Sequence, residues 1–167
     1  MGYGVAGVCW RGPRIFEGPI SKAIVKNWIG FYNRYRDTLT SDMLIHVRRP
    51  DGQNLDAILH ANPSSDKAKG LLFVFNPTDA AITTNLSVPL YYTGLSESAT
   101  VVRGNNKTSS LDTTSNLRLS SHVASPLLDE VEVEEVNVPL RRDYSIAVEM
   151  TVSASGYAWW VINDGVF

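Results

Sequence analysis

The spacing of the apolar residues changes once along this chain, near residue 42, and this change constrains the fold more than any other feature. Between residues 19 and 39, apolar side chains recur at intervals of three and four, as they do along one face of an α-helix. After residue 42 they recur at every second position, as they do on one face of a β-strand. The sequence therefore predicts one N-terminal helix followed by a region of strands.

The predicted helix spans residues 19–39, with Pro19 suited to its first turn and Ser21 able to cap it. Its apolar stripe carries four aromatic rings, those of Trp28, Phe31, Tyr32 and Tyr35. Fully burying one large apolar side chain contributes roughly 1.5–3 kcal/mol, so a stripe of this kind needs a large partner surface. We expect the helix to fold back on the strands or to pair with a second copy. Self-association through helix 19–39 is favoured, because a flexible loop precedes the helix.

The strand region contains several segments of regular alternation separated by turn residues. The continuous apolar run at 71–75 is typical of a central strand that is covered on both faces. The other predicted strands lie at 43–47, 55–61, 82–92, 99–102, 131–140, 144–152 and 157–162. Strands at this spacing, with no helix between them, predict a mainly β chain: an antiparallel β-sandwich with one N-terminal α-helix.

The first eighteen residues are rich in glycine and proline, which indicates a loop, yet they are too apolar for a free tail. We place a boundary after residue 41. Residues 1–41 then form a loop and a helix that are expected to pack against a structure outside the β-sandwich. Residues 42–167 form the β-sandwich domain, which we expect to fold without the helix.

The overall charge and the cysteine content exclude several classes of function. Fifteen basic and seventeen acidic residues give a net charge of −2, and no long basic run is present, so we expect neither a nucleic-acid nor a membrane partner. A single cysteine, Cys9, excludes an internal disulfide and a cysteine-based zinc cluster. The N-terminus does not resemble a signal peptide, so we expect a soluble chain, and the sequence does not assign it to a cellular compartment. No phosphate loop or dinucleotide motif occurs, and no cofactor is expected.

Few polar residues form a pattern that suggests chemistry. His46 and His60 lie in the two arms of the first predicted hairpin and could face one another, but no third ligand is indicated. A structural histidine pair is therefore favoured over a metal site. No pair of acids lies in a setting that suggests a raised pKa, and the acidic run at 129–135 is typical of a solvated strand face. The sequence predicts no catalytic residue and no metal ligand.

Aromatic residues are the more informative group, because sugar rings stack on exposed tyrosine and tryptophan faces. Tyr157, Trp159 and Trp160 are candidates for sugar stacking, and so are Tyr91 and Tyr92. Neighbours in a strand point to opposite faces, so Trp159 and Trp160 cannot share one platform. Packing in a core or a domain interface is therefore favoured for these rings over sugar stacking.

Taken in order, several stretches resemble parts of bacterial glycosidases of the alpha-galactosidase-like superfamily. Residues 3–7 (YGVAG) and 9–14 (CWRGPR) resemble the loop after the last strand of the catalytic barrel of these enzymes. Residues 25–37 (VKNWIGFYNRYRD) resemble the final helix of that barrel. Residues 41–42 (SD), 45–52 (IHVRRPDG) and 59–63 (LHANP) are similar to the first hairpin of the β-sandwich that follows the barrel in these enzymes. Residues 70–77 (GLLFVFNP), 88–92 (VPLYY) and 156–159 (GYAW) complete the pattern. The resemblance covers most of the chain except roughly residues 104–130.

The resemblance implies that residues 1–41 are the last loop and helix of a catalytic barrel, and that 42–167 are the sandwich attached to it. Such enzymes carry their catalytic acids on earlier barrel strands, so no catalytic residue is carried over and no activity is expected from this chain alone. Trp10, Arg11 and Arg14 would either approach the substrate cleft or brace the barrel rim.

The function implied by the resemblance is a non-catalytic C-terminal region that packs against the catalytic barrel of its own parent protein and stabilises it. The parent would be a glycosidase in the periplasm or outside the cell. The alternative function is a carbohydrate-binding module that grips glycan through surface aromatics.

Overall fold

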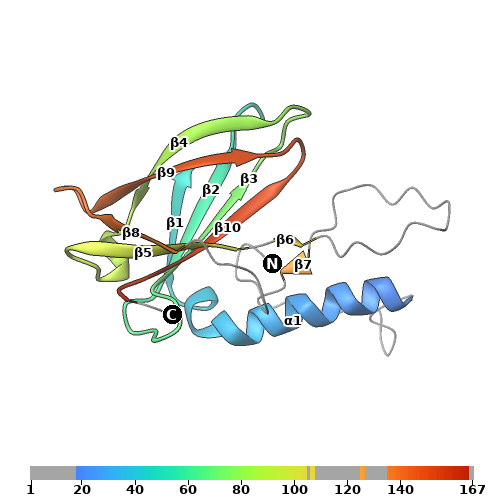
Figure 1. Cartoon of the computed structure of the whole chain (residues 1–167), viewed down its shortest axis with the longest axis horizontal. Coiled ribbons are helices and arrows are strands. Elements are labelled where there is room, and N and C mark those ends of the chain that lie inside the picture. The colour runs from blue at the N-terminus through green and yellow to red at the C-terminus, as the bar shows by residue number, and fades with distance from the viewer. Residues whose placement is uncertain (1–17, 105, 108–124, 127–134, 166–167) are drawn as a thin grey trace.

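The computed structural model describes residues 18–104, 106–107, 125–126 and 135–165. Within these residues the protein is mainly β, with one long helix lying along one side of a β-sandwich (Figure 1). The elements are α1 (Pro19–Leu39), β1 (Met43–Arg48), β2 (Asp56–Ala61), β3 (Gly70–Phe75), β4 (Ile82–Pro89), the 3-10 turn η1 (Tyr91–Thr93), β5 (Ser98–Arg103), β6 (Asn106–Lys107), β7 (Ser125–Pro126), β8 (Glu135–Pro139), β9 (Ser145–Val152) and β10 (Tyr157–Asn163).

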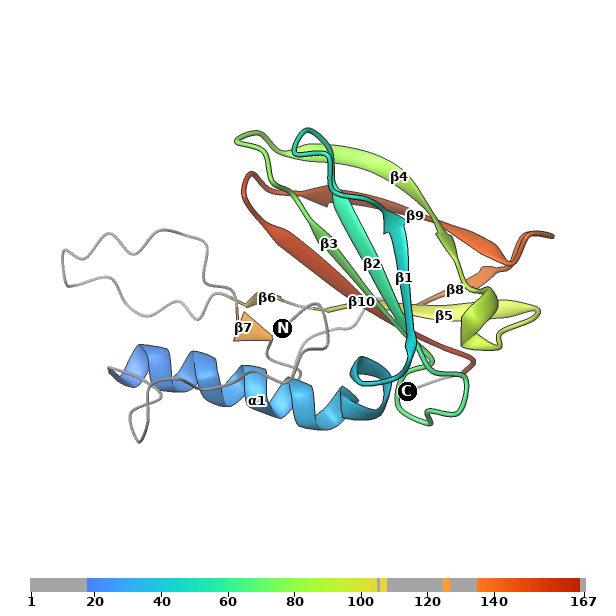
Figure 2. The same ribbon diagram turned by 180° about the vertical axis from the view of Figure 1, so that it is seen from behind.

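The described strands form two packed sheets and a short ladder. Six of them pair in the order β1-β2-β3-β10-β5-β8, while β4 pairs with β9, and every pair is antiparallel. The β4–β9 pair lies on one face of the six-stranded sheet and α1 lies on the other, as the two opposite views show (Figures 1 and 2). The short β6–β7 ladder lies beside α1. The antiparallel β-sandwich with one N-terminal helix, predicted from the sequence, is confirmed.

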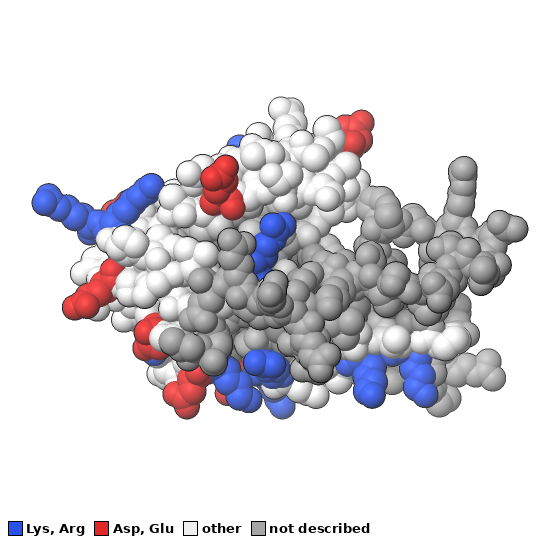
Figure 3. All heavy atoms as spheres, in the orientation of Figure 1, with Lys and Arg blue, Asp and Glu red and all other residues white. Residues whose placement is uncertain are grey.

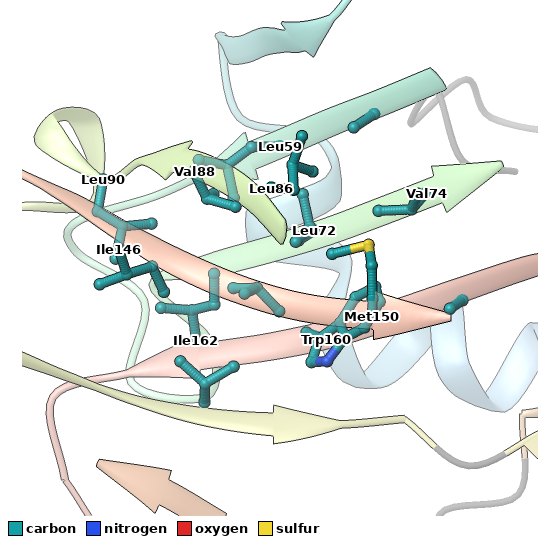
Figure 4. Close-up of a cluster of buried hydrophobic side chains, with 14 of the residues drawn as sticks. Leu59, Leu72, Val74, Leu86, Val88, Leu90, Ile146, Met150, Trp160 and Ile162 are labelled. Atoms are coloured by element: carbon teal, nitrogen blue, oxygen red, sulfur yellow. The ribbon is translucent and has the colours of Figure 1, made fainter. Parts of the chain in front are cut away.

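A first core fills the space between the two sheets (Figure 4). Alternate residues of each strand point into it, which is the cause of the period of two in the sequence. From the six-stranded sheet it receives Leu59, Leu72, Val74, Trp160 and Ile162, and from β4, β9 and the loop after β4 it receives Leu86, Val88, Leu90, Ile146 and Met150.

A second core lies between α1 and the opposite face of the six-stranded sheet. The intervening residues of the same strands supply Ile58, Leu71, Phe73, Trp159 and Val161, and the helix supplies Phe31, Tyr35 and Leu39. Strand β3 is thus buried on both faces, as its continuous apolar run predicts. Of the two outcomes expected for the aromatic stripe, the structure has the helix folded back on its own strands.

Polar contacts hold the C-terminal end of α1 to the loops of the sandwich. The Thr38 hydroxyl donates to the carbonyl oxygen of Ala68 at 2.5 Å, and the Asn62 amide donates to the carbonyl of Asp37 at 3.0 Å. Packing therefore continues without a break across residue 41. Because α1 shares a core with the sheet, we expect residues 42–167 to lose stability when the helix is removed.

Two strand ends differ from the expected ones. β4 ends at Pro89 rather than continuing to residue 92, because Leu90 leaves the extended conformation (φ −107, ψ 9) and leads into η1. β9 begins at Ser145, since Tyr144 has a positive φ of 59. The first residues of the strand predicted at 131–140 lie outside the described residues, which resume at Glu135.

The turn between β1 and β2 contains a carboxylate, that of Asp51, whose pKa is lowered by hydrogen bonds. The Asp51 carboxylate accepts hydrogen bonds from the Asn54 side chain at 2.7 Å and from the backbone N–H groups of Gln53 and Asn54 at 2.9 and 2.7 Å. These bonds, led by the one from the Asn54 side chain, lower the pKa of Asp51 to about 2. Because the pKa is lower in the folded state, the ionised Asp51 stabilises the fold. This stabilisation is complete above the ordinary pKa of 3.8 and is lost as the pH falls towards 2.

We expect an NMR titration of the Asp51 carboxyl carbon to give a midpoint near 2. The Asn54→Ala variant should move that midpoint up towards the ordinary value, because it removes the side-chain hydrogen bond that lowers the pKa of Asp51 most. A wild-type midpoint at the ordinary value would show that the turn does not hold the carboxylate as described.

Candidate functional site

The two tryptophans proposed for sugar stacking are both buried, one in each core. Trp159 is 0% exposed, and its ring meets that of Phe31 edge to face at 4.8 Å between centroids. Trp160 is 4% exposed on the opposite face of β10, where the Arg103 guanidinium lies 5.7 Å from its ring centroid. Neither indole has a face open to a sugar, and both side chains belong to the packing of the sandwich.

Tyr157, the third candidate from the same strand, is partly buried under the helix. Its ring lies 6.0 Å from that of Trp28, and burial raises the pKa of its hydroxyl to about 12. Tyr157 therefore joins α1 to the edge of the second core and does not combine with Trp160, which points the other way.

The other predicted site residues do not come together in the described structure. Trp10, Arg11 and Arg14 lie outside the described residues. His46 pairs across the hairpin with Ile58, whereas the buried His60 pairs with Leu44 and packs at 5.9 Å from the Phe73 ring. Across the described ranges, no three His, Cys, Asp or Glu side chains are grouped so that they could hold a metal ion.

Three tyrosines form the largest exposed aromatic group in the described part of the chain. Tyr91, Tyr92 and Tyr144 are 65%, 50% and 41% exposed. The Tyr91 ring lies 5.3 Å from that of Tyr92 and 5.7 Å from that of Tyr144, with interplanar angles of 88° and 79°. We call these three residues the tyrosine patch. Rings in contact and open to solvent are the feature on this surface most suited to binding.

The patch is built where β4 ends and β9 begins, and the ladder between these strands brings the two loops together. Pro89 is paired with Ser145, and the next residue, Leu90, donates its N–H to the carbonyl of Tyr144 at 2.8 Å. Leu90 is itself buried in the first core, and its carbonyl accepts the Thr93 hydroxyl at 2.6 Å. The tyrosines therefore stand on loops that are anchored to the sandwich.

The turn that carries Tyr144 is closed and strained. The N–H of Tyr144 donates to the carbonyl of Arg141 at 2.9 Å, and the N–H of Arg141 donates to the carbonyl of Ser145 at 2.9 Å. Tyr144 has φ 59, a left-handed conformation that bulky residues rarely adopt and that costs on the order of 1–3 kcal/mol. The surrounding structure holds this strain and keeps the ring in the patch.

Charged groups of both signs lie on the turn that carries Tyr144. Arg141 and Arg142 are exposed, and Asp143 accepts hydrogen bonds from the Ser145 hydroxyl at 2.7 Å and from its N–H at 3.1 Å. The bond from the Ser145 hydroxyl is the main cause that holds the pKa of Asp143 below its usual range. The patch thus offers ring faces and hydroxyl groups, and the turn that carries Tyr144 adds two guanidinium donors and a carboxylate acceptor.

Sequence reasoning named Tyr91 and Tyr92 but missed Tyr144. In the sequence, Tyr144 is the first member of the alternating run 144–152, so it was assigned to a regular strand. Its positive φ takes it out of that strand, and no residue pattern signals such a conformation for a tyrosine.

Comparison with protein-family models, with curated proteins and with solved structures found no significant match to this chain. Among the described residues, no helix is both long enough and apolar enough to cross a membrane.

Proposed function

We propose that this chain is the non-catalytic C-terminal β-sandwich region of a bacterial glycoside hydrolase, and that it packs against the catalytic barrel of its parent protein and stabilises it. The proposal starts from the ordered resemblance of several stretches between residues 3 and 92, and of residues 156–159, to glycosidases of the alpha-galactosidase-like superfamily. The sandwich-plus-helix architecture is compatible with that origin.

The burial of the aromatics in β10 is the observation that supports this function over a sugar platform on that strand. A platform for a glycan needs rings whose faces are open to solvent. Trp159 and Trp160 are instead packed on opposite faces of the sheet, and Tyr157 lies beside Trp28 of α1. These side chains hold the helix and the two sheets together, which is what a structural accessory requires.

In this proposal α1 stands between the sandwich and the barrel. Its aromatic stripe faces the sheet, while Lys22, Lys26, Ile29, Asn33 and Arg36 are exposed on the other side. Figure 3 shows Lys and Arg side chains along the edge of the molecule where α1 runs. A barrel would therefore meet a largely basic and polar face of the helix.

The DNA upstream of Met1 tests this function directly. We expect an in-frame barrel-coding region with a pair of carboxylates at strand ends, and a stop codon there would refute the proposal. The chain alone should not hydrolyse aryl glycosides. Turnover that survives purification and disappears when one acid of this chain is mutated would also refute it.

A further inference from the structure

We propose that the tyrosine patch is a binding site for a soluble oligosaccharide of two or three sugar units. The proposal rests on Tyr91, Tyr92 and Tyr144 and on the turn at 141–144, and it holds whether or not the chain belongs to a glycosidase. It assigns ligand binding to loops at one end of the β4–β9 pair and not to the aromatic strand β10.

The size of the patch selects a small ligand. Whole aromatic side chains bury about 150–250 Å² each, so the exposed parts of these three rings together offer roughly 250–400 Å². A stable protein partner usually covers about 800 Å² on each side of its interface. The patch is therefore too small to hold a protein by itself, whereas a few sugar rings would cover it.

The angles between the rings select the form of the glycan. Tyr91 stands nearly perpendicular to both of its neighbours, at 88° and 79°. A flat polysaccharide surface needs coplanar rings, and these three do not provide them. A ring face meeting ring edges forms a corner instead, which suits a short, free oligosaccharide that presents C–H groups to one ring and hydroxyls to the next.

The tyrosine hydroxyls and the polar groups of the turn that carries Tyr144 suit the hydroxyls of a sugar. Each tyrosine hydroxyl both donates and accepts hydrogen bonds, the guanidinium groups of Arg141 and Arg142 donate, and the Asp143 carboxylate accepts. Exposed rings with donors and acceptors on the neighbouring turn supply both kinds of contact that a sugar makes. A backbone hydrogen bond of 2.8 Å joins Leu90 to Tyr144, so binding does not have to bring the two loops together.

The test is an NMR titration of the full chain, labelled in its tyrosine rings, with maltotriose, cellotriose, xylotriose and trigalacturonate as probes. We expect at least one probe to shift the resonances of Tyr91, Tyr92 and Tyr144 with saturation in the millimolar range or tighter. The comparison of neutral probes with trigalacturonate shows whether the arginines favour an acidic sugar.

Two variants and one control make the result specific. Tyr91→Ala should weaken binding about 3- to 10-fold, the value expected for the loss of one ring contact. Tyr144→Gly should weaken it similarly while leaving the fold intact, because glycine adopts φ 59 without strain. Leu44→Ala, at an exposed position of β1, should bind as the wild type does.

Three results would overturn the proposal. One is the absence of ring shifts with all four probes, and another is binding that both tyrosine variants retain in full. The third is a change in the ring resonances with protein concentration instead of with sugar, which would make the patch a contact between copies of the chain. None of these results bears on whether a barrel is encoded upstream, so the two proposals fail separately.

Discussion

A chain that begins at residue 42 is expected to be insoluble or to melt without cooperativity. Removing α1 takes Phe31, Tyr35 and Leu39 out of the second core and uncovers Trp159 and Phe73. Losing the burial of three large side chains removes roughly 5–9 kcal/mol, which is comparable with the entire 5–15 kcal/mol that stabilises a typical domain. The uncovered sheet face would also be an apolar patch larger than monomers usually expose.

Circular dichroism melts and light scattering of the full and shortened chains would measure this effect. The full-length Ile29→Ala variant is a suitable control, because Ile29 is 42% exposed on the outer face of the helix and its truncation should leave the melt almost unchanged. If the shortened chain melted cooperatively near the temperature of the full chain, the boundary after residue 41 would be right and α1 would not be part of the core.

The Gly104→Ala substitution is expected to destabilise the protein by about 3 kcal/mol, at the upper end of what overpacking a core usually costs. A Cβ atom at residue 104 would lie 1.9–2.2 Å from three ring atoms of Trp159. The ring cannot move aside, because it is fully buried and rests against Phe31. The backbone cannot move either without breaking the 2.8 Å hydrogen bond from the N–H of Gly104 to the carbonyl of Trp159.

Gly30→Ala is the matched control for this substitution. Gly30 lies inside α1 with nothing within 4 Å of its Cβ position, so alanine should stabilise the protein by about 0.5–1 kcal/mol through helix propensity. For a chain of this length, each kcal/mol shifts the melting temperature by about 2–4 °C, so we expect a fall of roughly 6–12 °C for Gly104→Ala and a small rise for Gly30→Ala. A neutral Gly104→Ala variant would mean that Trp159 does not lie over Gly104.

The order and type of the main elements could be predicted because they follow from side-chain periodicity. The apolar stripe and Pro19 locate α1, and alternation locates β9 and the hairpin of β1 and β2. The continuous run in β3 correctly indicates burial on both faces.

The element that covers each buried face could not be predicted. A stripe of aromatic rings shows that the face must be buried, but it does not identify the surface that covers it. The alternation of Trp159 and Trp160 likewise places them on opposite faces without identifying the layers that cover them. The register of the hairpin is also invisible in the residue pattern. His46 lies opposite Ile58, and the register then shifts between His46 and Arg48.

The contact between Phe31 and Trp159 decides whether the aromatic stripe is covered by its own chain, and it can be measured directly. Isotope-filtered NOE spectra would be recorded on the full chain and on a mixture of labelled and unlabelled copies. With a centroid distance of 4.8 Å, we expect strong cross-peaks between the two rings within one copy and none between copies. Cross-peaks that are absent within a copy, or that arise between copies, would contradict the packing of α1 on its own sheet and would support self-association through the helix instead.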